Sequence, residues 1–253
     1  MTLRWTAQDS VADRAHRVAA TLPDWYSPAA SPELTVLDGS TEWFSHDFSD
    51  ILVFDPVFTK TTDASLTGRI TLAEPFSGAP GLASLPAFAA DSILVTAFEH
   101  GDDLNTAILH AVRLLRVTGV TDLRFDHLRT TAGSALADGT GLIGGRRVPL
   151  GLTVALTTAR PATHTLQFFT TDTVAALTVP DGSDARPVLA TVTRPDGATT
   201  LPTHYESADR YAWRRAHQAY TQGVATPDVL SCFLADLRTV ASLIGAPGDI
   251  DSQ

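Results

Sequence analysis

The sequence predicts a short α/β lobe followed by a larger α+β lobe built on an open, mainly antiparallel sheet. Three observations carry this prediction. In residues 1–100, an amphipathic helix precedes short apolar runs that read as buried strands. After residue 121, β-branched runs recur between Asp-Gly turn pairs. Two amphipathic helices close the chain. The expected domains are therefore residues 1–100 and residues 101–253.

The first predicted helix covers residues 9–22, whose apolar side chains recur at helical spacing. Asp9 or Ser10 can cap its start, and Pro23 ends it because proline cannot continue a helix.

Three continuous apolar runs follow, at residues 51–54, 70–73 and 92–98, and each is typical of a buried strand. The first run ends at Asp55-Pro56, and a Gly/Pro-rich stretch with a brief helix-like segment separates the last two.

A strong helix is predicted at residues 102–117, where aspartates favour its N-terminus and Gly119 ends it. The predicted strands of the second lobe are residues 122–129, 150–158, 164–170, 174–179, 188–193 and 199–203. The turn pairs between them are Asp138-Gly139, Asp181-Gly182 and Asp196-Gly197. The terminal helices are predicted at 207–222 and 227–244. The glycine-rich stretch 139–147 lacks Walker spacing, and a mobile hairpin loop is favoured over a phosphate site.

Composition excludes several classes of protein. The net charge of −10 argues against a nucleic-acid binder, because phosphate neutralisation needs clustered Lys and Arg. The single cysteine, Cys232, excludes an intrachain disulfide and a Cys-based metal site, and its apolar helical setting predicts a buried thiol. No apolar run approaches about 18 residues, so no membrane span is expected. The polar N-terminus shows no signal peptide, and a cytoplasmic protein is expected.

The beginning of the chain lacks a glycine-rich turn. A dinucleotide-binding domain normally opens with an apolar strand and Gly-x-Gly-x-x-Gly, whose backbone N–H groups approach the pyrophosphate at a helix N-terminus. Here the first glycine is Gly39, and no such opening strand is evident. A phosphate therefore has no evident cradle, and no cofactor is expected.

The order of elements resembles the Gfo/Idh/MocA family of sugar and cyclitol oxidoreductases. The stretches that carry the likeness are residues 13–19, 55–56, 66–75, 103–113 and 211–244. Residues 66–75, Leu-Thr-Gly-Arg-Ile-Thr-Leu-Ala-Glu-Pro, are similar to the family's segment ending in Glu-Lys-Pro. The resemblance implies a reduced Rossmann-like N-terminal domain, a C-terminal lobe on an open antiparallel sheet, and an NAD(P)-dependent oxidoreductase of a sugar, cyclitol or other small hydroxy or imine substrate.

The departures from the family fall on its chemistry. Glu74 runs directly into Pro75, so the family's cofactor-contacting lysine is missing. Ala107 occupies the family's catalytic histidine position, and His110 occupies its paired aspartate position. Three residues along a helix is nearly one turn, so His110 can lie on a similar face and replace the proton relay. The favoured alternative is a helix histidine between the two lobes.

If the protein is enzymatic, the candidate catalytic residues are Glu74, His100 and His110. The candidate cofactor-binding residues, taken from the resemblance, are Asp55, Pro56, Glu74 and Pro75. The polar cluster at residues 99–103 lies between a strand and a helix, where it can bind a sugar or a metal, but capping by its aspartates is favoured. No metal site is predicted.

Three functions remain open: a non-catalytic subunit beside an active homologue, a small-molecule-binding relative, and a divergent NAD(P)-dependent oxidoreductase. Loss of the glycine turn, the lysine and the histidine together favours the first. The apolar residues of the predicted strands exceed what two terminal helices can bury, which predicts a homo-oligomer, or a hetero-oligomer with a catalytic homologue, formed sheet to sheet. These residues are Leu152, Val154, Leu156, Leu166, Phe168, Val174, Leu177, Val188 and Val192.

Overall fold

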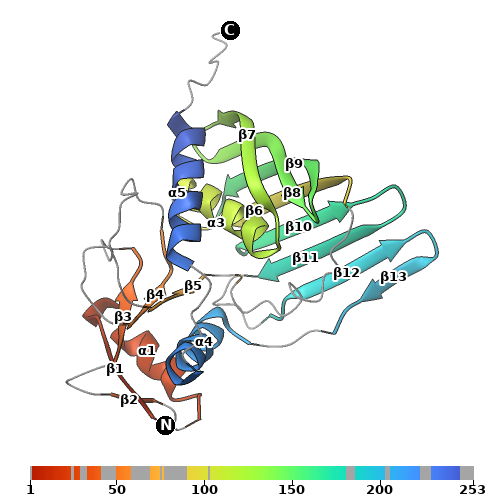
Figure 1. Ribbon diagram of the computed structural model, residues 1–253. Coiled ribbons are helices and arrows are strands. Elements are labelled where there is room, and N and C mark those ends of the chain that lie inside the picture. Colours follow the sequence, from red (N-terminus) through yellow and green to blue (C-terminus); the bar gives the residue numbers. More distant parts are fainter. Residues whose placement is uncertain are drawn as a thin grey trace. The chain divides into compact units, whose positions relative to one another are not determined.

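The computed structural model divides into two compact units (Figure 1). Unit 1 comprises Met1–Gly78 and Glu206–Ala235, and unit 2 comprises Ala79–Tyr205 and Asp236–Gln253. The structure describes residues 2–23, 26–28, 33–40, 50–57, 69–74, 76, 90–101, 103–180, 186–202, 206–222 and 229–245. This grouping differs from the expected division at residue 100, since residues 79–100 fall in unit 2.

Unit 1 contains a five-stranded parallel sheet in the order β2-β1-β3-β4-β5. Its strands are β1 (Leu3–Ala7), β2 (Tyr26–Pro28), β3 (Leu34–Asp38), β4 (Asp50–Phe54) and β5 (Arg69–Ala73). Its helices are η1 (Asp9–Val11), α1 (Ala12–Ala19) and α4 (Ala208–Gln222). The α/β prediction for this part of the chain is confirmed.

The chain does open with a strand, contrary to the sequence-based expectation. In β1, Leu3 and Trp5 are buried while Arg4 and Thr6 between them are exposed. The apolar signal comes from only two large side chains at strand spacing, so it is weaker than the continuous run of β4, all of whose residues are buried.

The core of unit 1 is aromatic, and α4 contributes to it. The rings of Trp5 and Trp213 pack edge to face with centroids 5.1 Å apart, and those of Tyr26 and Trp213 lie 4.6 Å apart. Burial of Trp213 and its neighbours on α4 places this helix in unit 1 rather than in the C-terminal sheet domain expected from the sequence.

Unit 2 contains an eight-stranded sheet in the order β13-β12-β11-β10-β6-β9-β8-β7, with α3 on one face (Figure 1). The pairing of β6 with β9 is parallel, and every other pair is antiparallel. The strands are β6 (Ser92–Glu99), β7 (Thr121–Thr130), β8 (Ser134–Ile143), β9 (Arg146–Leu156), β10 (Thr163–Phe169), β11 (Val174–Pro180), β12 (Leu189–Arg194) and β13 (Gly197–Thr200). The prediction of a mainly antiparallel sheet is confirmed.

Helix α3 (Leu104–Val117) covers the apolar face of this sheet, and nine of its residues are buried. The sequence analysis assigned that cover to the terminal helices and judged it insufficient, which is wrong for most of the residues involved. The following are buried within the chain: Leu152, Val154, Leu166, Phe168, Leu177 and Val192. Leu156, Val174 and Val188 are half-buried.

The Asp138-Gly139 pair lies inside β8 and is not a turn. A Cβ at Gly139 would lie 2.1 Å from the backbone oxygen of Arg124, so glycine is required here by the close approach of the irregular β7 strand. The chain instead reverses at Gly144-Gly145, both in left-handed conformation. The predicted turn before Gly197 is confirmed, and Asp181-Gly182 lies outside the described residues.

Helix α5 (Val229–Gly245) buries Phe233, Leu237 and Val240 along one side. Cys232 is exposed, so the expected buried thiol is wrong: it precedes Phe233 on the helix and points away from that stripe. No helix in the described part of the chain is both long and apolar enough to span a membrane.

Candidate functional site

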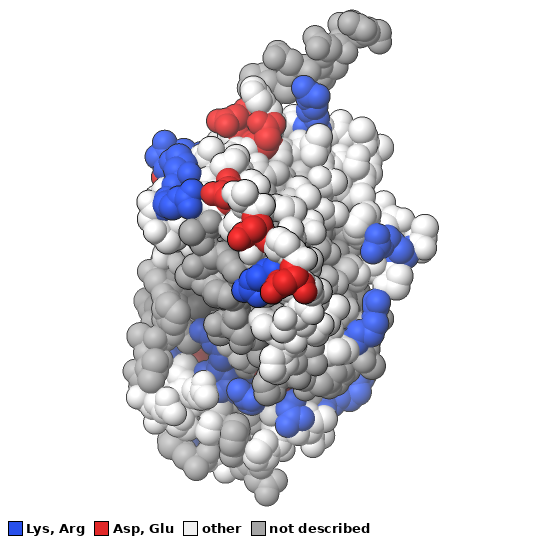
Figure 2. Space-filling model, turned by 90° about the vertical axis from the view of Figure 1, so that its right-hand side faces the viewer, with Lys and Arg blue, Asp and Glu red and all other residues white. Residues whose placement is uncertain are grey.

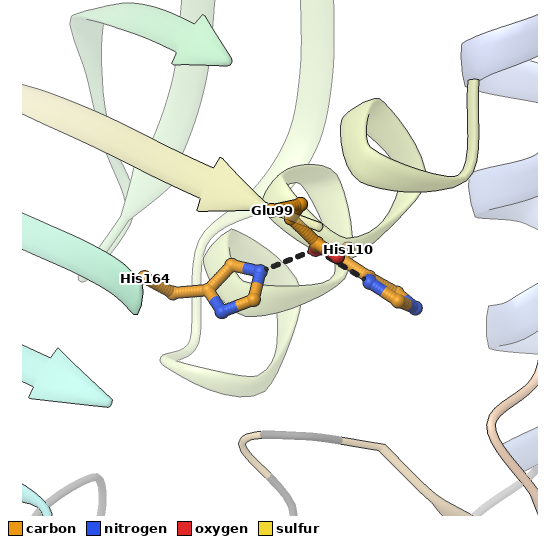
Figure 3. Close-up of side chains that lie close together, drawn as sticks. All are labelled: Glu99, His110 and His164. Atoms are coloured by element: carbon orange, nitrogen blue, oxygen red, sulfur yellow. Dashed lines mark hydrogen bonds and ion pairs between the residues drawn. The ribbon is translucent and has the colours of Figure 1, made fainter. Parts of the chain in front are cut away.

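Three side chains from separate elements of unit 2 meet around one carboxylate oxygen (Figure 3). Nδ1 of His110 and Nε2 of His164 each lie 2.7 Å from Oε1 of Glu99. The two imidazole rings stand edge to face, with centroids 6.0 Å apart. We call Glu99, His110 and His164 the His–Glu–His cluster.

The strands and the helix bring the cluster together from distant parts of the chain. Glu99 is the last residue of β6, and the neighbouring strand β10 pairs with β6 so that His164 lies opposite Ala97. His164 shares the buried face of β10 with Leu166 and Phe168, because alternate residues of a strand face the same side. His110 lies on the buried side of α3, which covers that face.

Burial by itself opposes ionisation of Glu99, but the hydrogen bonds from the two imidazoles outweigh it and hold its pKa well below the usual range. Glu99 is therefore a carboxylate at neutral pH. The cluster presents one anionic oxygen and two imidazole nitrogens, a set suited to holding a metal ion or to moving a proton.

The sequence-predicted catalytic residues take three different positions. His110 enters the cluster. His100 is exposed, and its Nε2 lies 2.9 Å from the backbone oxygen of Arg160. Glu74 is buried directly after β5 in unit 1. Asp103 caps α3 by accepting hydrogen bonds from the backbone of Asn105 and Thr106, which confirms the capping interpretation for this residue.

His164 was missed by the sequence analysis. The available signal was its spacing: it occupies the first position of the apolar alternation that continues through Leu166 and Phe168. A histidine on such a face is buried and needs a polar partner. The sequence alone does not identify that partner, since Glu99 is 65 residues away.

The carboxyl ends of the unit 1 strands carry acidic side chains. Asp38 ends β3, and its carboxylate accepts hydrogen bonds from Ser10 and Ser40. Asp55 follows β4 with a positive φ of 48°. Arg14 on α1 donates two 2.7 Å hydrogen bonds to Asp209 and also pairs with Asp55. Pro56 is buried, and Pro75 lies outside the described residues.

Comparison with known proteins was informative at the level of structure. No family model matches the sequence, and no curated protein sequence is significantly similar to it. Solved oxidoreductases match almost the entire chain. The 3-ketoreductase KijD10 from Actinomadura kijaniata, solved with TDP-benzene and NADP, has a TM-score of 0.63 and 13% identity over 96% of this chain and 97% of its own.

Two further structures agree. UDP-N-acetylglucosamine 3-dehydrogenase GnnA from Acidithiobacillus ferrooxidans has a TM-score of 0.64 and 11% identity, covering 96% of both chains. The dehydrogenase MviM from Clostridium difficile has a TM-score of 0.60 and 7% identity, over 96% of this chain and 89% of its own. The chain has the Gfo/Idh/MocA fold. The expected fold class is confirmed, with a Rossmann-like unit 1 and a unit 2 built on the large sheet.

The Gfo/Idh/MocA fold implies a dinucleotide, and its phosphates would lie where β1 leads into the first helix. Here β1 passes through Gln8 and Asp9 into η1 without a glycine. Gly39, the first glycine of the chain, is a packing residue, because a Cβ there would lie 2.5 Å from the backbone oxygen of Phe54. With Asp38 hydrogen-bonded to Ser10 at this position, the residues do not fit a pyrophosphate.

Proposed function

We propose that this protein is a small-molecule-binding relative of the Gfo/Idh/MocA oxidoreductases that does not use a dinucleotide and acts as a non-catalytic partner of an active homologue. The observation that carries the proposal is the acidic end of the parallel sheet. Asp38 is hydrogen-bonded to Ser10 at the beginning of the first helix of unit 1, where the fold's phosphates would bind.

Charge is the physical reason. A carboxylate about 4 Å from a phosphate oxygen opposes binding by about 1 kcal/mol in water and about 4 kcal/mol at the effective dielectric near a protein surface. Asp9 lies in the first turn after β1, and Asp13 in the first turn of α1. The cation of this region, Arg14, is already committed to two carboxylates. The site therefore offers repulsion where the fold needs donors.

Charges elsewhere give no support to a phosphate-rich partner. Figure 2 shows one face of the molecule, on which the charged side chains of the described residues lie singly or in small groups between uncharged ones. With the net charge of −10, we propose that nucleic acids are not partners.

Calorimetric titration of the full chain with NADH and NADPH tests the proposal. No saturable binding is expected at ligand concentrations up to about 1 mM, the level at which the binding free energy is only about −4 kcal/mol. KijD10, whose structure was solved with NADP, is the positive control. A dissociation constant in the micromolar range would overturn the proposal and favour the second candidate.

The second candidate is an NAD(P)-dependent oxidoreductase acting on a sugar, cyclitol or other small hydroxy or imine substrate. It is favoured by the fold, whose solved neighbours include NADP complexes. His110 would serve as the proton-transfer residue, because it is hydrogen-bonded to an ionised carboxylate. Dinucleotide reduction or oxidation with a panel of such substrates distinguishes this candidate from the first.

We further propose that the face of the large sheet opposite α3 pairs with a second chain, either a copy of this one or a catalytic homologue. Leu136 on this face is 53% exposed, and its neighbours Leu94, Thr153 and Phe169 are half-buried. Light scattering of the purified chain is expected to give a dimer or larger species, and Leu136→Glu is expected to shift it toward monomer. A monomer at micromolar concentration that captures no homologue would refute pairing.

A further inference from the structure

We propose that the His–Glu–His cluster is a binding site for a divalent transition metal ion, with Zn²⁺ the best match. This inference goes beyond the proposed function, because it concerns unit 2 alone and involves no dinucleotide. Glu99, His110 and His164 each offer one ligand atom, and these atoms all lie within 4.8 Å of one another.

The donor types select the metal. Two imidazole nitrogens and one carboxylate oxygen form a three-ligand set that zinc uses in catalytic sites, with water or substrate in the fourth position. Mg²⁺ and Ca²⁺ prefer oxygen ligands throughout, so the two histidines disfavour them. No thiolate is near this set, since Cys232, the single cysteine, is exposed on α5.

The distances fit a metal after small movements. Zn–N and Zn–O bonds of about 2.1 Å place tetrahedral donors about 3.3 Å apart. The two nitrogen-to-oxygen distances of 2.7 Å are slightly shorter than this, as expected for hydrogen bonds that an ion would replace. Small changes in side-chain torsions of Glu99 would open the three donors to that separation.

The surroundings also suit an ion. The side chains of His110 and His164 are 9% and 3% exposed, so they are held by packing on α3 and β10. Glu99 is the most exposed of the three, with 15% of its side chain accessible. A fourth position on the Glu99 side would therefore be reached by water or by a small ligand, while the buried histidines hold the ion from within.

The test uses untagged full-length protein stripped with a chelator and then titrated with Zn²⁺ and with Co²⁺. We expect one ion per chain, a rise in melting temperature on addition of Zn²⁺, and visible absorption typical of four- or five-coordinate Co²⁺. Glu99→Gln, His110→Gln and His164→Gln are each expected to weaken Zn²⁺ binding by about 100-fold or more, since even a residue that only orients a ligand contributes about 10–100-fold.

The matched control is His127→Gln, which removes an exposed histidine from β7 and is expected to leave Zn²⁺ affinity unchanged. Circular dichroism of each variant verifies folding, and the wild-type stoichiometry and Co²⁺ spectrum decide the question if a cluster variant fails to fold. The proposal is overturned if the wild-type chain binds no stoichiometric metal, if Co²⁺ gives only an octahedral spectrum, or if folded variants at His110 and His164 bind Zn²⁺ as tightly as the wild type.

Discussion

Asp236→Asn is expected to be among the most destabilising conservative substitutions in unit 2. The Asp236 carboxylate is fully buried and receives hydrogen bonds of 2.9 Å from Arg113 and of 2.9 and 2.6 Å from Arg116. These bonds join α5 to α3, the helix that covers the large sheet. The substitution keeps the shape of the side chain but removes its charge.

The magnitude follows from the burial of the arginines. The side chain of Arg113 is 5% exposed and that of Arg116 is 21% exposed, so Arg113 has little access to water when the carboxylate is neutralised. Removing one member of a buried ion pair costs about 3–5 kcal/mol. For a chain of this size, that corresponds to a fall in melting temperature of roughly 6–20 °C.

Urea denaturation followed by far-UV circular dichroism measures the change in the free energy of unfolding. The control, Asp126→Asn, alters an exposed aspartate on β7 and is expected to change this free energy by less than about 0.5 kcal/mol. A loss below about 1 kcal/mol for Asp236→Asn would refute the reasoning, because surface pairs have that value.

Three further outcomes are expected. Gly139→Ala should destabilise the chain by about 1–3 kcal/mol in thermal denaturation, because its Cβ would lie 2.1 Å from a backbone oxygen; Gly133→Ala, where the nearest atom is 3.9 Å away, is the steric control. Burial raises the pKa of Asp38, but hydrogen bonds from Ser40 and Ser10 prevail and lower it, so its stabilisation is full above the ordinary carboxyl pKa and is lost as the pH falls through the lower folded value. Unfolding measured across acidic pH should therefore lose this component in Asp38→Asn, and an identical pH profile would contradict it. Arg14→Lys should lower the melting temperature of the chain, because lysine cannot replace the bidentate pairing of the guanidinium, and an unchanged value would show that only the charge matters.

Local sequence patterns determined most of the elements. The continuous apolar run of β4 and the long amphipathic helix α3 were identified because their patterns are strong within one segment. The absence of glycine between β1 and α1 was also visible in the sequence, and it is the observation on which the proposed loss of the dinucleotide rests. β1 was missed because its apolar signal consists of only two large side chains.

Tertiary structure decided the rest, because each remaining feature depends on residues that are distant in the chain. Glu99 and His164 meet only through the pairing of β6 with β10, and α3 adds His110 by covering that sheet. The role of Gly139 depends in the same way on the approach of β7, which turned an apparent turn into a strand. A single sequence reports spacing along the backbone, whereas a site is formed by distances across it, and those are set when the sheet selects its register.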